Sequence, residues 1–333
     1  MREAPLRRRV LLAGALLAPS GALSTAPSIA RAQGFAPSRP VTLIVNSPPG
    51  GSTDYTARLV AEPLAARLGQ PVVVENRPGG AGVVGVKYAA AAKPDGHVLM
   101  VGYSGTMTGW PAVKGTADYD PLRDFAPIAL LTEAPQVMMV HPSVPVRTLP
   151  EFIAYAKARP GELSYASSGN GSLQHLGTEL LKYRTGIDLL HIPYRGTGET
   201  LSDFLAGRVQ FYMTTPPPVL GFLRDGKLRP IALASPRRHP SLAEVPTTAE
   251  AGLTDYAAEA WFGLFAPAAT PAPIIAWYAA EAASVLAEPR VAARALDAGA
   301  FARFEDPATL RARMERETAA WTALVQAVGI RPD

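Results

Sequence analysis

The sequence predicts an α/β fold with two lobes that are joined by two extended crossings of the chain. Short runs rich in β-branched and aromatic residues alternate with stretches whose apolar residues recur at helical spacing, a pattern typical of mostly parallel sheets. No fixed repeat and no low-complexity linker separates two halves, so two lobes require more than one passage between them. Residues 132–140 and 257–266 are extended and are the candidate crossings.

The predicted strands are short apolar runs bounded by glycine, proline or polar turn residues. They cover residues 41–45, 72–75, 97–102, 128–131, 137–141, 163–166, 189–192, 209–213, 230–234 and 261–266. Helices are predicted over residues 54–68, 172–185, 198–206, 274–286 and 310–328. Gly69, Gly186 and Gly207 are placed to end the first three helices, and Pro63 should kink the first because it lacks an N–H donor.

Length and composition exclude several classes of protein. The chain has 333 residues, 48% of them apolar, which supports one large domain or two ordinary ones. It has no cysteine, which excludes a disulfide scaffold, thiol catalysis and thiolate zinc sites. Residues 1–32 hold five of the 32 basic residues and one of the 28 acidic ones, so 27 of each remain elsewhere. The rest of the chain therefore lacks the basic footprint of a nucleic-acid-binding protein.

Residues 1–32 have the order of a secretory signal peptide. Three arginines at positions 7–9 precede an apolar run at 10–18, and an A-x-A cleavage pattern ends at Ala32. The apolar run is far shorter than the ~20 residues that span a bilayer. We expect cleavage near Ala32 and export of a soluble mature protein, through either the general or the twin-arginine route.

The loop after the first predicted strand is the first candidate ligand site. A helix N-terminus offers unpaired N–H groups and a partial positive charge, so it can bind an anion without lysine or arginine. Glycines let a ligand approach the backbone, and hydroxyls add further donors. From this loop alone, a plain strand–turn–helix connection remains equally open. The candidate residues are Pro49, Gly50, Gly51, Ser52, Thr53 and Asp54.

A second loop of the same kind follows the strand at 163–166 and leads into the helix that carries His175. Both loops leave the carboxyl ends of strands, where open α/β sheets bind ligands. His175 is either a ligand contact or a structural histidine. The candidate residues of this loop are Ser167, Gly169, Asn170, Gly171 and Ser172.

A third glycine-rich segment contains a formal G-x-G-x-x-G at Gly80, Gly82 and Gly85. The acidic residue that a nicotinamide site needs ~20 residues further on is missing, and Pro78 interrupts the turn. We therefore interpret this segment as a glycine-lined rim beside Asn76, whose amide can hydrogen-bond a ligand.

Further candidates follow other predicted strands, so parallel sheets would bring them to one crevice. Arg195 is the side chain best suited to pair with a carboxylate, with a solvated surface arginine as the alternative. Asp203 lies on the polar side of a predicted helix and matters only if that side borders a cleft. The remaining candidates are Tyr103, Ser104, Tyr194 and Thr214.

Catalytic and metal-binding patterns were sought in the sequence. There is no G-x-S-x-G, no H-E-x-x-H and no metal-ligand spacing among the five histidines. The candidate crevice is also poor in carboxylates. We therefore expect a binding protein without catalytic residues, metal or cofactor, with an exported hydrolase as a rival interpretation.

Several motifs along the mature chain together resemble those of the Bug family of extracytoplasmic solute receptors, which are related to the binding subunit of tripartite tricarboxylate transporters. The motifs are P-x-G-G-S-T-D with a following A-R at 48–58, L-G-Q-P-V-V-V-E-N-R-P-G-G-A-G at 68–82, D-G-H-V-L at 95–99, Y-D-P-L-R-D-F-A-P-I at 119–128, S-Y-A-S-S-G-N-G-S-L-Q-H-L at 164–176, H-I-P-Y-R-G at 191–196, D-F-L-A-G-R-V-Q at 203–210, V-P-T-T-A-E-A-G at 245–252 and W-F-G-L-F-A-P at 261–267.

The resemblance implies a two-lobed, type II-like periplasmic binding protein fold with a ligand cleft between the lobes. We expect lobe 1 to comprise residues 33–134 and 257–333, and lobe 2 residues 135–256. In that family the loops matching 49–54 and 167–172 grip carboxylate oxygens, partly through waters. The positions that usually line or border the cleft match Asn76, Ser104, His175 and Asp203.

Two departures from the family pattern bear on the ligand. Tyr103 stands where the family often has asparagine, and Thr214 stands where it commonly has aspartate. The loss of that acid removes a partner for a ligand ammonium, which favours a di-, tri- or aromatic carboxylate without an amino group. The resemblance further implies a monomeric periplasmic protein whose partners are the membrane subunits of a tripartite tricarboxylate-type transporter. A receptor that docks to a membrane signalling protein is the alternative.

Overall fold

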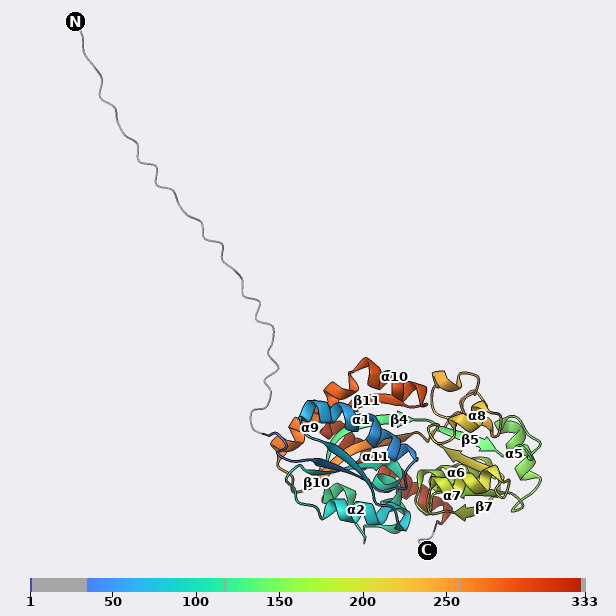
Figure 1. Ribbon diagram of the computed structural model, residues 1–333. Coiled ribbons are helices and arrows are strands. Elements are labelled where there is room, and N and C mark those ends of the chain that lie inside the picture. The colour runs from blue at the N-terminus through green and yellow to red at the C-terminus, as the bar shows by residue number, and fades with distance from the viewer. Residues whose placement is uncertain (2–34, 117, 257, 331–333) are drawn as a thin grey trace. The chain divides into compact units, whose positions relative to one another are not determined.

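A computed structural model describes Met1 and residues 35–330 except positions 117 and 257. The predicted signal peptide lies outside the described residues beyond Met1. Within residues 35–330 the strands form two sheets, one of six strands and one of five (Figure 1). None of the helices in the described part of the chain combines the length and the apolar character needed to cross a membrane.

The six-stranded sheet has the order β11-β4-β10-β3-β1-β2. Its strands are β1 (Val41–Val45), β2 (Val72–Asn76), β3 (Val98–Tyr103), β4 (Phe125–Ala134), β10 (Ala260–Pro267) and β11 (Phe301–Glu305). The helical segments that follow these strands are α1 (Ser52–Leu68), η1 (Gly80–Gly82), α2 (Val83–Ala90), η2 (Gly105–Gly109), α3 (Trp110–Lys114), α4 (Pro121–Asp124), α9 (Ala272–Leu286), α10 (Pro289–Asp297) and α11 (Pro307–Val328).

The five-stranded sheet has the order β7-β6-β8-β5-β9. Its strands are β5 (Gln136–Val140), β6 (Ser164–Ser167), β7 (Leu190–Pro193), β8 (Phe211–Thr214) and β9 (Arg229–Ala234). The helical segments of this part are α5 (Leu149–Lys157), α6 (Leu173–Thr185), α7 (Thr197–Leu205), α8 (Leu220–Arg224) and η3 (Pro240–Leu242).

The chain crosses between the sheets twice, as predicted. β4 ends at Ala134 in one sheet and β5 begins at Gln136 in the other, so Pro135 alone separates them. The return runs from β9 to β10. The prediction of mostly parallel strands is wrong, since five of the nine strand pairs in the described residues are antiparallel, and β5 and β10 run antiparallel to both of their neighbours. These strands arrive from the other sheet rather than through a helix on the same sheet, so nothing forces them to be parallel.

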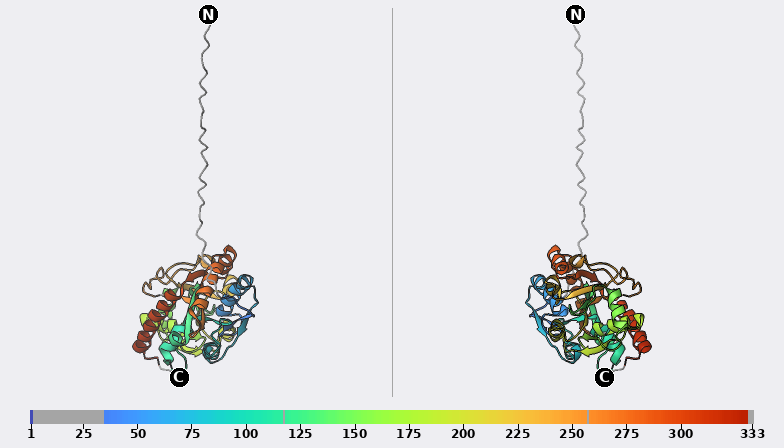
Figure 2. Two further views of the ribbon diagram at one scale, coloured as in Figure 1. Left: turned by 90° about the vertical axis from the view of Figure 1, so that its left-hand side faces the viewer. Right: turned by 90° about the vertical axis from the view of Figure 1, so that its right-hand side faces the viewer.

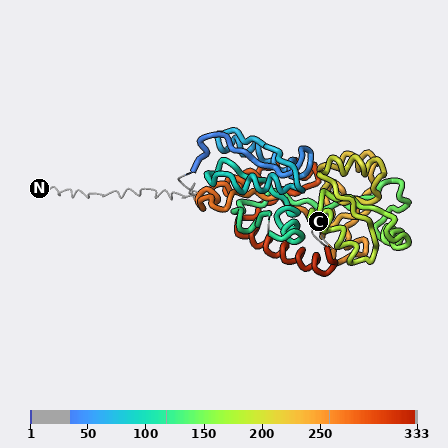
Figure 3. Tube along the Cα trace, turned by 90° about the horizontal axis from the view of Figure 1, so that it is seen from below, coloured from blue at the N-terminus to red at the C-terminus, as the bar shows by residue number. Residues whose placement is uncertain are grey.

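Alternate residues of β1 pack against opposite faces of the six-stranded sheet. Leu43 and Val45 join the cluster that includes α1, whereas Ile44 joins Leu310 and Met314 of α11. Figures 2 and 3 show α1 in blue and α11 in dark red on opposite sides of this sheet. A strand that is covered on both faces reads as a continuous apolar run, which is why β1 was predicted with its correct bounds.

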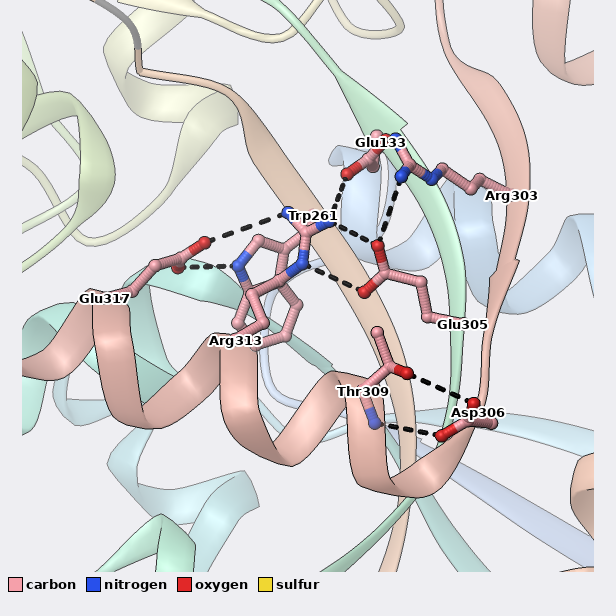
Figure 4. Close-up of polar contacts among 8 residues, drawn as sticks. All are labelled: Glu133, Trp261, Arg303, Glu305, Asp306, Thr309, Arg313 and Glu317. Carbon is pink, nitrogen blue, oxygen red and sulfur yellow. Dashed lines mark hydrogen bonds and ion pairs between the residues drawn. The ribbon is translucent and has the colours of Figure 1, made fainter.

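α11 is fixed to the six-stranded sheet by an ion-pair network (Figure 4). Arg313 pairs with Glu133 of β4 at 2.9 Å and with Glu305 of β11, and both carboxylates are more than nine-tenths buried. Glu317 accepts a hydrogen bond of 2.7 Å from the indole of Trp261 on β10, and burial raises the pKa of Glu317. The far end of α11 reaches α6, where Val325 packs with Leu176 (Figure 3).

Candidate functional site

A pocket with a volume of about 60 Å³ lies where strands from both sheets end. Water needs roughly 10–15 Å³ on this measure, so the space suits a small ligand only. Residues just after the carboxyl ends of β1, β6, β7 and β8 contribute to its walls. The lining residues are Asn46, Ser47, Pro48, Gly51, Ser52, Thr53, Gly79, Ala81, Gly82, Tyr103, Gln136, Ser168, Gln174, Arg195, Gly196, Thr197, Thr214, Thr215, Ala260 and Phe262.

Two helices begin at this pocket: one belongs to the part of the chain that forms the six-stranded sheet, the other to the part that forms the five-stranded sheet. α1 follows Gly51 and α7 follows Gly196, and both of these N-cap glycines line the pocket. A glycine has no side chain to cap the helix, and neither N-terminus has a side-chain cap. The first-turn N–H groups and the positive ends of both helix dipoles are therefore left for a ligand, which favours an anion.

The side-chain charges of the lining point to the same ligand class. Arg195 is the one charged residue in the lining, and no carboxylate is among the lining residues. The Arg195 side chain is exposed and makes no ion pair within the described residues. A guanidinium with free donors can bind a carboxylate with two parallel hydrogen bonds.

Hydroxyl groups link the two parts of the chain across the pocket. The Ser52 hydroxyl of α1 lies 2.5 Å from that of Thr215, which follows β8. Tyr103, at the end of β3, is hydrogen-bonded to Ser168, and burial raises the pKa of Tyr103 to about 12. Its ring also stacks on Phe262 with centroids 6.4 Å apart. The pocket thus has a neutral aromatic wall.

The structure brings together part of the predicted site. Gly51, Ser52, Thr53, Tyr103, Arg195 and Thr214 all line the pocket. The other predicted residues lie outside the lining, and several have their polar groups bonded elsewhere. They are Pro49, Gly50, Asp54, Asn76, Ser104, Ser167, Gly169, Asn170, Gly171, Ser172, His175, Tyr194 and Asp203.

Asp54 and Asn76 lie outside the pocket lining and stabilise the first loop by hydrogen bonds. The Asp54 carboxylate accepts hydrogen bonds from the Gly50 N–H, from Arg58 and from the Asn76 amide, each at 3.0 Å. Asn76 also donates to the carbonyl of Ser47 at 3.1 Å. Burial alone would raise the pKa of Asp54, but these hydrogen bonds lower it below its ordinary value. Both side chains therefore fix the shape of the loop that carries the pocket residues.

The second loop is braced in a similar way, and this changes its role. Ser172 caps α6 by accepting a hydrogen bond from the His175 N–H, and His175 Nδ1 accepts one from the Gly171 N–H at 3.2 Å. Ser172 therefore satisfies one of the free N–H donors at the α6 N-terminus. Gly171 lets this loop approach Trp110 closely, since a Cβ there would lie 3.1 Å from its backbone. From this loop only Ser168 lines the pocket, with Gln174 from the first turn of α6.

Tyr194 and Asp203 contact each other away from the pocket. The Tyr194 hydroxyl donates to Asp203 at 2.9 Å, and Arg208 donates to the same carboxylate at 2.6 Å. The Arg208 and Tyr194 hydrogen bonds lower the pKa of Asp203. The Asp203 carboxylate therefore bonds to these two neighbouring side chains and lies outside the pocket lining.

Outside the glycine-rich third segment, eleven lining residues were not among the candidates, namely Asn46, Ser47, Pro48, Gln136, Ser168, Gln174, Gly196, Thr197, Thr215, Ala260 and Phe262. Gln136 carried a usable signal, because it is a polar residue in an otherwise apolar crossing. Gly79, Ala81 and Gly82 of the glycine-rich third segment line the pocket, whereas Asn76, predicted to contact the ligand beside it, does not. No group of acidic or histidine side chains that could hold a metal ion occurs in residues 35–330 outside positions 117 and 257.

His175 should make the folded state less stable as the pH falls from about 6.5 to about 4. Burial holds its pKa down to about 4, and nearby Lys182 adds to this effect. The unfolded chain takes up the proton near pH 6.5, so stability is full above that pH and falls by up to about 3 kcal/mol at pH 4. His175→Asn keeps an acceptor for the Gly171 N–H but cannot titrate. Urea unfolding across this range should show a flatter profile for the variant, and identical profiles would contradict the assignment.

Comparisons with known proteins agree with the fold. Residues 56–330 match the family model described as tripartite tricarboxylate transporter family receptor. BugT of Bordetella pertussis is 39% identical over 240 residues, which cover 72% of this chain and 74% of BugT. The chain is also similar to a solved R. palustris protein with adipate, at 35% identity and a TM-score of 0.86 over 89% of this chain and 99% of that one.

Two further solved structures support the same relationship. MatC from Rhodopseudomonas palustris with bound malate is 35% identical, with a TM-score of 0.81 over 87% of this chain and 99% of that one. The periplasmic binding protein BugD is 30% identical, with a TM-score of 0.83 over 89% of this chain and all of that one. The two-sheet architecture is thus that of periplasmic binding proteins. This chain belongs to the Bug family of tripartite tricarboxylate transporter receptors.

Proposed function

We propose that this protein captures a small organic carboxylate in its pocket and passes it to the membrane subunits of a tripartite tricarboxylate-type transporter. The observation that carries the proposal is a pocket with two uncapped helix N-termini, one arginine and no lining carboxylate. That surface suits an anion and not a cation. The ligands of two solved relatives, adipate and malate, are both carboxylates.

We further propose that binding closes two lobes, residues 33–134 with 257–333 and residues 135–256. Sheet membership supports this division, because the six-stranded sheet draws its strands from the first set and the five-stranded sheet from the second. A carboxylate that accepts hydrogen bonds from both α1 and α7 binds the closed form better than an open one. This difference in affinity drives closure.

The proposed place of action is the periplasm, where the receptor works as a monomer. The signal-peptide pattern of residues 1–32 and the family's description as a transporter receptor support this placement. Expression of the full chain with a C-terminal tag should release a mature form beginning near Gln33 into the periplasmic fraction. Retention of the uncleaved chain in the cytoplasm would contradict the proposal.

A panel of carboxylates tests the function directly. Di-, tri- and aromatic acids are added to the exported protein and the thermal unfolding midpoint is recorded. At ~100 times its dissociation constant a true ligand should stabilise the fold by about 2.7 kcal/mol. Sugars and amines of similar size serve as controls. Stabilisation by a sugar or an amine, or by no carboxylate of a wide panel, would contradict the proposed ligand class.

Arg195→Met should weaken binding of the carboxylate about tenfold, because it removes the charged donor of the lining. The loss should shrink as salt is added, since the side chain is exposed and its field is screened. Titration calorimetry at two salt concentrations measures both effects. Arg224→Met on α8 is the matched control, because this arginine is exposed and lies outside the lining. Equal affinities for the two variants would remove Arg195 from the site.

A further inference from the structure

The Tyr103 side chain lies at the end of β3, on the face of the six-stranded sheet that borders the pocket. Tyr103 is directly opposite Phe262 of the antiparallel strand β10, so the two side chains lie on the same face of the sheet. Ala260, two residues before Phe262 on β10, shares that face. All three residues line the pocket, so this face of the sheet forms one of its walls.

The ring of Tyr103 is the part of this residue that forms the wall. The ring stacks on Phe262 with centroids 6.4 Å apart, and its hydroxyl is hydrogen-bonded to Ser168, which follows β6 in the other part of the chain. Phe262 and Ser168 both line the pocket. The ring therefore reaches from one lining residue to another and closes the pocket along this side.

The contacts of the ring hold it in this position. A Cβ on Gly105 would lie 2.6 Å from the Tyr103 hydroxyl oxygen, so the ring already packs on the Gly105 backbone. Ser168, the hydrogen-bond partner of the ring, itself donates to Gln174 Oε1 at 3.1 Å. Moving the ring aside would break its hydrogen bond or press it into backbone atoms, and either change costs free energy. The wall is therefore rigid.

The pocket that this wall closes is small. Its volume is about 60 Å³, where one water needs roughly 10–15 Å³ on the same measure. The donors that we propose for the ligand's carboxylate, the N-termini of α1 and α7 and the Arg195 side chain, border the same space. The carbon chain of a ligand has only the space that remains, so a rigid ring at its end decides how long the chain can be.

We propose that the Tyr103 ring limits the length of the ligand, so that the protein selects short dicarboxylates over longer ones. This inference rests on the proposed function, because it adds a length limit to the carboxylate that the function requires. A close-fitting wall discriminates strongly against added carbon atoms, since one methylene changes affinity by about 10–200-fold. Tyr103 is thus a specificity-determining residue as well as a lining residue.

A series of unbranched dicarboxylates tests the limit in the exported protein. The series is malonate, succinate, glutarate and adipate, which carry the same charged groups and differ from one to the next by one methylene. Titration calorimetry should show the tightest binding for malonate or succinate. Adipate should bind at least about tenfold more weakly than the tightest ligand.

Variants connect this preference to the ring. Tyr103→Ala should remove the preference, because the space of the ring becomes part of the pocket, and adipate should then bind at least as tightly as succinate. Tyr103→Leu is a second enlarged variant that keeps more apolar volume and should change the order in the same direction. Circular dichroism checks that both variants fold.

Two further variants are controls. Tyr103→Phe keeps the ring and lacks only the hydroxyl, so it should keep the preference for short acids whatever happens to the overall affinity. Tyr88→Ala removes an aromatic ring that is 42% exposed on α2 and lies outside the pocket lining. It should leave both the affinities and the preference unchanged.

The outcomes separate this inference from the proposed function. If neither this series nor any other carboxylate binds, the proposed function fails. If adipate binds as tightly as the shorter acids, or if only carboxylates outside the series bind, the carboxylate function stands and the length limit is wrong. An unchanged preference in both enlarged variants, or its loss in Tyr103→Phe, would likewise overturn the assignment of the limit to the ring.

Discussion

Gly51→Val should lower carboxylate affinity at least 100-fold, or by about 2.7 kcal/mol, while the protein still folds. The backbone at Gly51 has φ −82° and ψ 172°, an extended conformation that valine adopts readily. A Cβ at this position would lie 3.7 Å from the Thr197 hydroxyl and 3.9 Å from that of Ser47, without a clash. The two methyl groups beyond it must then enter a pocket of about 60 Å³ and cover the first N–H groups of α1.

Two controls separate this effect from general damage. Gly51→Ala adds only the Cβ, so it should retain most of the affinity. Gly221→Val makes the same exchange on α8, where a Cβ would meet nothing within 4 Å, and should leave binding unchanged. Calorimetry gives the affinities and circular dichroism checks the fold. If Gly51→Val binds as tightly as Gly51→Ala, the α1 N-terminus does not hold the ligand.

The Gly51 loop could be predicted from the sequence because its signal is local. A buried strand, a glycine-rich turn and a helix that ends at Gly69 follow one another without interruption, and Gly69 has the predicted left-handed conformation with φ 66°. Local pattern also located the other strands except β11 to within a few residues. Of the eleven α-helices in the described part of the chain it located five, and it missed α2, α3, α4, α5, α8 and α10. β11 was missed because it carries two charged residues: Glu305 is buried beside Arg313, to which it is paired, and Arg303 is 48% exposed.

The loop before α6 contributes less to the pocket lining than predicted, for a physical reason that is visible in the sequence. The loop before α6 is rich in glycine and serine, so it was taken as the second anion site. Ser172, however, is an N-cap residue that satisfies its own helix, whereas Gly196 before α7 cannot do so. Gly196 therefore leaves the first N–H groups of α7 without a side-chain cap, whereas Ser172 caps α6.

The remaining lining residues depend on how two sheets meet. Gln136 and Phe262 lie on the crossing strands and approach the pocket from different sheets. The spacing of apolar residues in either strand does not predict where the two sheets meet, because their contact results from long-range packing. A polar residue within an apolar crossing strand is nevertheless a candidate site residue, since a buried polar group without a hydrogen-bond partner requires an explanation.

Arg313→Met should lower the free energy of unfolding by about 3 kcal/mol, which is the second large effect we expect. The guanidinium pairs with Glu133 at 2.9 Å and donates to Glu305 at 3.0 Å through its Nε, and it is itself only 19% exposed (Figure 4). Removing it leaves buried carboxylates that Arg303, 48% exposed, compensates only in part. Burying a charge without its partner costs far more than an exposed ion pair contributes.

Arg311→Met is the matched control on the same helix. Arg311 pairs with Glu315 at 3.2 Å, but the two side chains are 47% and 52% exposed, so its loss should cost no more than about 0.5 kcal/mol. Urea unfolding of both variants at pH 7 gives the comparison. Equal stabilities would mean that the network positions α11 without stabilising it. A large loss confined to Arg313→Met would show that buried charge anchors α11 across β4 and β11, and thereby holds in place the helix that packs on α6.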